Sequence, residues 1–177
     1  LYKTISDSRL LIKNWVYIDK QSGTKDKKRL ENLHKVEFPQ FREQAEEYSA
    51  YLDPEDRPLY ENILQTISDT LFVDHRFVMD KLSSFESYDD LTVVFEVNPL
   101  VDEGGAITST TDRILSDLSF LIEKYSSKSD AAIAGMNESL TSFRIFIIIS
   151  SLITTVVGII IAFFLTSGIK RSVTQAT

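Results

Sequence analysis

Residues 145–169 read IFIIISSLITTVVGIIIAFFLTSGI, and this stretch decides how the whole chain is interpreted. It contains no charged side chain, while Arg144 stands directly before it and Lys170 and Arg171 directly after it. A helix rises about 1.5 Å per residue, so the run is long enough to cross a hydrocarbon core of about 30 Å with some tilt. We therefore expect a transmembrane helix over residues 144–169.

The charges before the run differ from those after it. The chain has 19 Lys and Arg and 26 Asp and Glu, a net charge of −7, and every acidic residue precedes Arg144. Cationic side chains gathered just past a span mark the cytoplasmic side. We therefore expect residues 1–143 on the extracytoplasmic, periplasmic side of the cell membrane and residues 170–177 in the cytoplasm. An acidic domain lacks the basic face of a nucleic-acid binder, although its charge also serves solubility alone.

The chain contains no cysteine, which excludes disulfides, thiolate metal sites and a cysteine nucleophile within it. It begins with Leu1 and shows no signal-peptide pattern there, so we expect an excerpt from a longer protein, cut at both ends. The sequence also lacks a phosphate-binding loop, a serine elbow and a metalloprotease motif. We therefore expect no enzymatic activity and no cofactor in this part.

Apolar residues recur at helical spacing, and glycine and proline are sparse, at six and four residues. A β-sandwich of this size would need more turn residues. The pattern predicts helices over residues 1–20, 25–52, 54–85 and from 107 onward without a break into the span. The simplest all-α arrangement is an antiparallel up-down-up-down four-helix bundle, with the last helix continuing into the transmembrane helix.

Prolines and acidic residues divide these helices. Pro39 lacks an N–H and clashes with the preceding turn, so we expect a kink or short break in the second helix. Asp53-Pro54 is a helix start signal, with the aspartate as cap and the proline at the first helical position. Residues 91–97 fit a strand or a helix, and we interpret them as helix. Asn98-Pro99 predicts a cap and a restarting helix, with Gly104-Gly105 as a weak point within it.

Three features carry a resemblance to a known family. They are the stretch SRLLI at residues 8–12 leading to Tyr17, the turn FESYDD at residues 85–90, and the order of long helix, span and KRSVT at residues 170–174. The chain resembles the four-helix-bundle sensory domain of bacterial transmembrane receptors, namely methyl-accepting chemotaxis proteins and membrane sensor histidine kinases. The similarity covers nearly the whole chain, and its motifs are patterns of helices rather than catalytic signatures.

The resemblance implies a ligand-sensing input domain, usually a homodimer, that binds a small molecule directly or through a periplasmic binding protein. A shift of the last helix would pass through the membrane to a cytoplasmic output module for chemotaxis or two-component signalling. In that family a HAMP signalling segment often follows the span; residues 171–174 match its start, and Ala176 stands where proline is expected. The alternative from another class is a membrane-tethered helical scaffold that binds a protein partner.

Members of this family often bind ligands near the membrane-distal end, through cationic side chains of the first helix. Arg9 and Lys13 are able to grip a carboxylate, and Trp15 offers a surface for stacking. The competing interpretation is that Trp15 anchors the core and that Arg9 and Lys13 are solvated. The candidate ligand-binding residues are Arg9, Lys13, Trp15, Tyr17, His75 and Arg76.

The remaining polar residues suggest structure rather than chemistry. His34 and His75 are the two histidines and lie on different predicted helices without a ligand-like partner at short spacing, so we expect no metal site. Asp74 falls on the apolar stripe of the third helix, where a buried carboxylate needs a partner such as Arg113 or Lys13. If the stripe drifts at this point, Asp74 instead faces water, which we prefer.

Overall fold

The computed structural model describes the backbone of residues 1–174 and the side chains of residues 1–159. These residues form helices and no strand, which confirms the all-α class. They divide into two compact units, Leu1–Lys124 and Tyr125–Thr177. The last residues of the predicted HAMP-like segment, including Ala176, lie outside the described residues. The predicted boundary at Arg144 concerns the membrane and stays a prediction.

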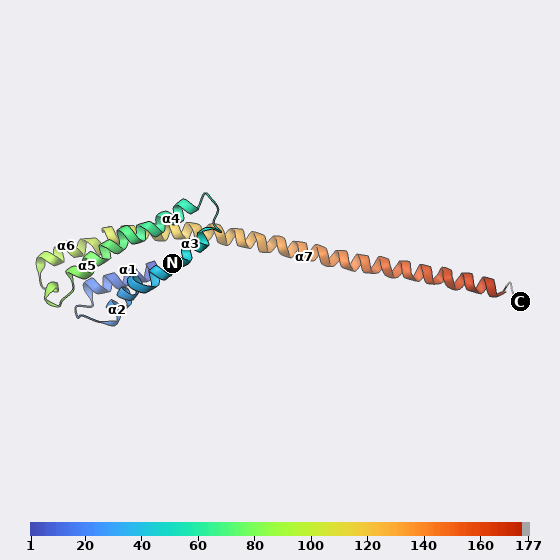
Figure 1. The fold of residues 1–177 in the computed structure, drawn as a ribbon, viewed down its shortest axis with the longest axis horizontal. Coiled ribbons are helices and arrows are strands. Elements are labelled where there is room, and N and C mark those ends of the chain that lie inside the picture. The colour runs from blue at the N-terminus through green and yellow to red at the C-terminus, as the bar shows by residue number, and fades with distance from the viewer. Residues whose placement is uncertain (175–177) are drawn as a thin grey trace. The chain divides into compact units, whose positions relative to one another are not determined.

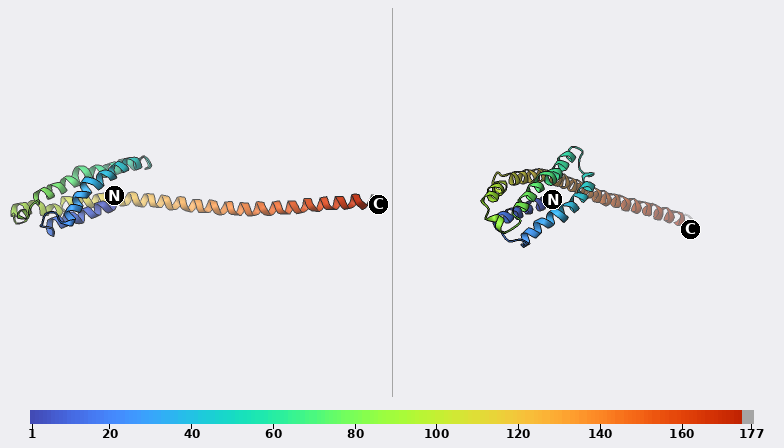
Figure 2. Two further views of the ribbon diagram at one scale, coloured as in Figure 1. Left: turned by 60° about the horizontal axis from the view of Figure 1, so that its bottom comes forward. Right: turned by 60° about the vertical axis from the view of Figure 1, so that its left-hand side comes forward.

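The first unit contains six α-helices, three short helical turns and the beginning of a seventh α-helix. Its elements are α1 (Tyr2–Tyr17), α2 (Lys25–Asn32), η1 (Leu33–Glu37), α3 (Phe38–Ser49), α4 (Arg57–Thr66), η2 (Ile67–Leu71), α5 (Phe72–Lys81), η3 (Glu86–Tyr88), α6 (Leu91–Val101) and the start of α7 (Ala106–Thr174). The α1–α2 loop and the α5–α6 loop lie at one end of this unit (Figure 1), and the α3–α4 loop lies at the other, as Figure 2 also shows.

The break predicted at Pro39 is present. The helix that starts at Lys25 changes to a π-helical turn in η1, and α3 follows with Pro39 in its first turn. The missing N–H of proline is tolerated there because the bulge already rearranges the backbone bonds. At the start of α2, Thr24 Oγ1 accepts a bond from the Lys27 N–H at 3.4 Å, and Gly23 has a φ of 73°.

The helix start predicted at Asp53-Pro54 is wrong by three residues. Asp53 O instead accepts the N–H of Asp56 at 3.0 Å and closes a turn, and α4 begins at Arg57. The reason is Pro58, which lies in the first turn of α4. A helix starting at Pro54 would place Pro58 in its interior, where proline costs about 3 kcal/mol.

Residues 91–97 are helical, as predicted, but the helix start predicted at Asn98-Pro99 is wrong. The helix α6 begins after Asp90, whose side chain accepts the Thr92 N–H at 2.9 Å, and it continues through Pro99 to Val101. The chain turns at Gly104-Gly105 instead. Gly104 has a φ of 80°, and a Cβ on Gly105 would lie 2.2 Å from the Pro99 carbonyl oxygen.

The core of the first unit draws on nearly every element. The helix α1 packs against α2, α5 and α6. Completely buried side chains include Ile5, Ile12, Leu30, Leu33, Ile67, Leu71, Val78, Val97, Val101 and Ile107. Each aliphatic side chain of this kind contributes about 1.5–3 kcal/mol to folding, before the entropy cost of ordering it. These positions follow the helical periodicity of the sequence, although apolar residues toward the helix ends, such as Ile18, Tyr48 and Phe85, are exposed.

The second unit consists of residues of α7. This helix is assigned without interruption over 69 residues, as the absence of proline after Pro99 predicted. Among the described residues, one helix is long and apolar enough to cross a membrane by length and composition. Its most apolar 18-residue window has a mean hydropathy of 2.0, and no part of that window is buried.

Candidate functional site

A cleft of about 340 Å³ opens at the end of the first unit where α1 turns into α2. It is lined by Trp15, Ser22, Gly23, Lys27, Glu31, Lys35, Arg76, Met79, Asp80 and Ser83. These residues come from α1, the α1–α2 loop, α2, η1, α5 and the loop after α5. The lining therefore combines an aromatic ring, three cations and two carboxylates within a space suited to a small molecule.

Lys27 lies beneath this cleft as a buried cation. Its side chain is 3% exposed, and its Nζ donates to the Tyr88 hydroxyl at 2.9 Å. The same Nζ lies 4.7 Å from the centre of the Trp15 ring and 5.0 Å from that of Tyr88, so both rings stabilise its charge. Burial lowers the pKa of Lys27, and the negative charge of Asp19 opposes that shift.

Trp15 and Tyr88 hold this arrangement in place. Trp15 is 5% exposed, and its indole N–H donates to the Leu82 carbonyl at 3.3 Å. The Tyr88 hydroxyl donates to the Trp15 carbonyl at 2.7 Å. Burial, followed by the charge of Asp19, raises the pKa of Tyr88 to about 12, so this hydroxyl stays protonated at neutral pH. Trp15 is thus both a core anchor and one side of the cleft.

The two other cations of the cleft are nearer to solvent. Lys35 pairs with Glu31 at 3.3 Å across one turn of helix, a contact worth about 0.5 kcal/mol or less. Arg76 is exposed, and its side chain forms no hydrogen bond or ion pair with any other residue that the structure describes. Its guanidinium is therefore available to a ligand, and it is the cation best suited to a bidentate bond with a carboxylate or phosphate.

The six candidate residues predicted from the sequence fall into two groups. Trp15 and Arg76 meet in the cleft. Arg9 instead pairs with Asp112 of α7 at 2.8 Å. The Tyr17 hydroxyl donates to Asp102 at 2.5 Å, and burial and this contact raise its pKa to about 12.

Lys13 is half-buried on α1 and does not line the cleft, while His75 is completely buried and does not line it either. Asp74 is half-buried and makes no ion pair with Arg113 or Lys13, and burial raises its pKa. Of the six predicted residues, two therefore belong to the cleft. Of the two cations of α1 that looked most suited to a ligand, Arg9 forms an ion pair within the unit and Lys13 does not line the cleft.

Sequence reasoning missed Lys27, the residue with the most unusual environment. A signal for it exists, because Lys27 precedes Leu30 by three residues and so extends the apolar stripe of that helix. A lysine on such a stripe needs a partner in the core. That partner, Tyr88, lies 61 residues further along the chain, which no local pattern reveals.

The two histidines form a second cluster. His34 Nε2 lies 3.1 Å from His75 Nδ1, although the sequence offered no reason to pair them. The His34 ring stacks on Phe72 with ring centres 3.9 Å apart. The outer nitrogens, His34 Nδ1 and His75 Nε2, are buried and have no hydrogen-bond partner among the described residues. Two histidines alone make a poor metal site, so the expectation of no metal stays a prediction.

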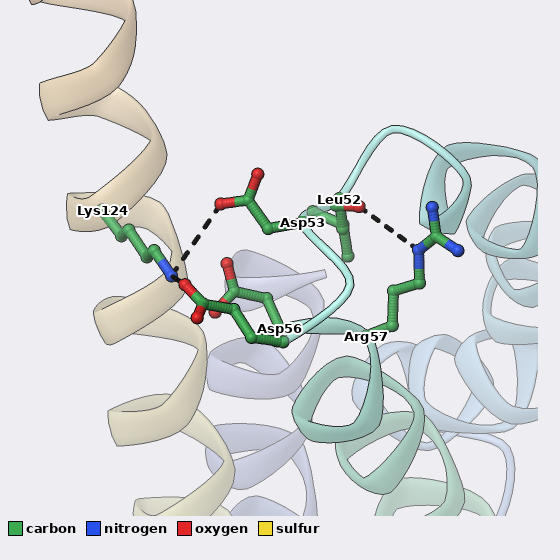
Figure 3. Close-up of polar contacts among 6 residues, drawn as sticks. Leu52, Asp53, Asp56, Arg57 and Lys124 are labelled. Atoms are coloured by element: carbon green, nitrogen blue, oxygen red, sulfur yellow. Dashed lines mark hydrogen bonds and ion pairs between the residues drawn. The ribbon is translucent and has the colours of Figure 1, made fainter.

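A third polar cluster ties the α3–α4 loop to α7. Lys124 Nζ lies 2.8 Å from Glu55 and from Asp56, and 3.9 Å from Asp53 (Figure 3). Asp56 is 5% exposed, so the lysine neutralises a buried carboxylate. Its bonds to Asp56 and Glu55 raise the pKa of Lys124. Three carboxylates in this arrangement are able to hold a metal ion, but here the ammonium group of Lys124 supplies the positive charge.

No protein-family model, curated protein or solved structure matches the chain. The resemblance to the sensory domains of transmembrane receptors therefore stays a prediction.

Proposed function

We propose that the chain is the extracytoplasmic input domain of a bacterial transmembrane signalling receptor, of the chemotaxis or two-component kind. Residues 1–143 detect a ligand, residues 144–169 cross the membrane, and residues 170–177 begin the cytoplasmic segment. The observation that supports this most is that α7 supplies buried side chains to the first unit, such as Ile107 and Ile114, and also contains the apolar run. The chain has no enzymatic role in this proposal.

The loop positions support an up-down-up-down bundle for the first unit. Its four segments are α1, then α2 with α3, then α4 with α5, then α6 with α7. Such a bundle places its first and third turns at one end, which is where the α1–α2 and α5–α6 loops lie (Figure 1). The cleft is at this end, and we propose that it is the membrane-distal one.

The ligand that fits this cleft best is a small anion with an apolar part. Arg76 supplies a bidentate cation, Lys27 a buried positive charge, and Trp15 an apolar surface. Glu31 and Asp80 set a limit, because they disfavour a ligand with several negative charges on that side. A monoanionic carboxylate or phosphate ester satisfies both conditions.

The exposed apolar side of α6 supports a homodimer. Leu91 and Phe95 are 69% and 76% exposed and lie one helical turn apart on the same face. A second copy would cover these side chains. The same face is what the alternative function requires, in which a membrane-tethered scaffold binds a different protein.

A thermal-shift screen of the full chain in lipid nanodiscs tests this proposal. The probes are small monocarboxylates and phosphate monoesters, each at several concentrations and neutral pH. A ligand at about 100 times its Kd stabilises the folded state by about 2.7 kcal/mol, which is readily measured as a rise in Tm. Arg76→Ala is expected to lose the rise, because it removes the free guanidinium.

Arg113→Ala is the matched control, since Arg113 is also exposed but belongs to α7 and does not line the cleft. Equal losses in both variants would show that the probe responds to net charge alone. No response to any probe, combined with capture of a protein partner that Leu91→Ser and Phe95→Ser abolish, would favour the scaffold.

A further inference from the structure

The His34–His75 pair has an unsatisfied hydrogen-bonding capacity in either tautomer. One ring donates its N–H to the other across the 3.1 Å contact. Whichever ring donates, the two outer nitrogens are left as one N–H and one lone pair, and both are buried with no partner in the part of the chain that the structure describes. Burying such groups costs free energy that the contact between the rings only partly offsets. The packing around the two rings therefore holds them in an arrangement that their own hydrogen bonding does not favour.

Added protons make this arrangement worse. The first proton goes to the outer lone pair of the donor ring and creates a buried cation with no acceptor. A second proton goes to the inner nitrogen that accepted the hydrogen bond. Both inner nitrogens, which lie 3.1 Å apart, then carry hydrogens, and the bond between the rings is lost. Burial, then the charge of Arg76, then that of Lys35, lowers the pKa of His34 to about 4. Burial, then His34 and Arg76, lowers the pKa of His75.

The charged groups around the pair all act in the same direction. Arg76 from α5 and Lys35 from η1 are both cations and both oppose protonation. No carboxylate of α1, α2 or the described part of α7 is among the charges that shift either histidine. The nearest titratable acid on α5 by sequence is Asp74, which makes no ion pair among the described residues. The described charges that shift the two histidines therefore all oppose a proton on the pair.

We propose that the His34–His75 pair is an acid-sensitive switch that controls the cleft. Taking up a proton drives the His34 ring out toward solvent, because it is the less buried ring of the two, and so moves η1 relative to α5. The next residues in the chain, Lys35 and Arg76, both line the cleft, so this movement changes the spacing between two of its cations. The π-helical turn η1 provides the freedom to move, because its backbone bonds are already rearranged.

This inference rests on the proposed function only in giving the cleft a ligand. Charge coupling between the two sites then follows, since an anion near Lys35 and Arg76 offsets the cations that oppose protonation. By linkage, acid would in turn favour the bound anion. The switch itself is a property of the protein alone and is measured without a ligand.

Two spectroscopic signals test the switch on the full chain in lipid nanodiscs. The chain has two histidines and one tryptophan, so histidine imidazole NMR reports the pair and the fluorescence of Trp15 reports the cleft. In a titration from about pH 7.5 to about pH 3 we expect both rings to stay neutral until at least about one unit below the ordinary value of 6.5. We expect the fluorescence to change with the same midpoint, with an unchanged helical circular dichroism spectrum.

Two variants separate the pair from the carboxylates. His34→Gln keeps a polar group near the position of Nε2 but does not titrate, and we expect it to abolish the fluorescence transition. Asp74→Asn is the control, because burial raises the pKa of this neighbouring carboxyl, and it should leave the transition unchanged. If His34→Gln fails to fold, the imidazole titration of the unaltered chain still decides.

Two outcomes overturn the inference. One is that the histidines titrate near 6.5, or that they titrate without any change in the fluorescence of Trp15. The other is a transition that survives His34→Gln and disappears in Asp74→Asn. Neither outcome affects the ligand screen with Arg76→Ala, and a cleft that binds no anion would leave the pH transition intact. The two proposals therefore fail separately.

Discussion

Lys27 illustrates how a single residue changes meaning once its surroundings are known. In the sequence it is one of several lysines near the start of a helix, and in the structure it is a buried cation enclosed by Trp15 and Tyr88. Burying a charge costs desolvation free energy, and the contacts with two aromatic rings and one hydroxyl offset that cost only in part. The buried ammonium group of Lys27 therefore lowers the stability of the folded protein. A negatively charged ligand in the cleft would offset this cost.

Lys27→Met is expected to leave the free energy of unfolding unchanged or raise it by about 1 kcal/mol. Methionine keeps the apolar stem and removes the desolvation cost, while the Tyr88 hydroxyl keeps its bond to the Trp15 carbonyl. Urea unfolding of the full chain measures this change, with the exposed neighbour Lys28→Met as control. A loss of more than about 2 kcal/mol would show that the ammonium group is needed for folding.

The histidine pair predicts a pH dependence of stability with a definite sign. The pKa of His34 is about 4 in the folded protein and about 6.5 in the unfolded chain, so the unfolded chain binds more protons between these values. The free energy of unfolding should therefore fall as the pH drops from about 6.5 to about 4, by about 3 kcal/mol from His34. Urea unfolding at several pH values measures it, and His34→Gln should be flatter by that amount. Parallel curves for the two proteins would contradict the prediction.

At the scale of the elements, the α3–α4 loop and α7 depend on each other through Lys124. The loop is a turn closed by backbone bonds to Asp53, and Arg57 strengthens it by donating to the Leu52 carbonyl at 3.2 Å. Figure 3 shows Lys124 pointing from its helix toward this loop. Lys124 is also the last residue of the first compact unit. The contact therefore fixes the α3–α4 loop against the part of α7 that belongs to the first unit.

Lys124→Met is expected to lower the Tm of the full chain, because it leaves the buried carboxylate of Asp56 without its cation. Glu55→Gln is the matched control, since Glu55 bonds the same ammonium group but is exposed. Circular dichroism melts in detergent micelles provide the comparison. Equal and small effects of the two changes would mean that the cluster is only a solvated surface contact.

At the scale of the whole molecule, one helix has two different environments. Residues of α7 such as Ile107 and Ile114 are buried in the first unit, while the described isoleucine, leucine, valine and phenylalanine side chains of its apolar run are exposed. A run of this length and hydropathy is stable in water only if something covers it. A lipid bilayer is the environment that satisfies it without further partners.

Ile153→Arg is expected to reduce the fraction of the chain that integrates into membranes. A charged residue near the centre of a span costs about 3 kcal/mol of insertion free energy, which shifts a single marginal span markedly. Carbonate extraction of membranes from expressing cells measures the integrated fraction. Ile133→Arg is the control, because Ile133 is also an exposed isoleucine of α7 but lies before the run. An equal effect of both changes would argue against residues 145–169 as the span.

The helices were predictable because their signals are local. The periodicity of apolar residues predicted most of the buried positions, and Pro39 predicted a kink or short break, which the structure shows as the π-helical turn before α3. The two wrong helix starts, at Asp53-Pro54 and Asn98-Pro99, each gave too much weight to a cap residue followed by proline. Pro58 excluded the first start, and the positive φ of Gly104 marks where the chain turns instead of at the second. In both places a nearby proline or glycine decides the outcome rather than the cap signal alone.

The sequence by itself determined an all-helical chain with one run apolar enough to cross a membrane, since both follow from spacing and composition along the chain. Only the tertiary structure decided which polar groups meet. Lys27 with Tyr88, His34 with His75 and Lys124 with Asp56 are each joined across at least 41 residues. Such pairs form because packed helices bring distant faces together. Burial then lowers the pKa values of Lys27, His34 and His75, while hydrogen bonds raise the pKa of Lys124. The pattern of residues within one helix does not predict which distant side chains it will contact.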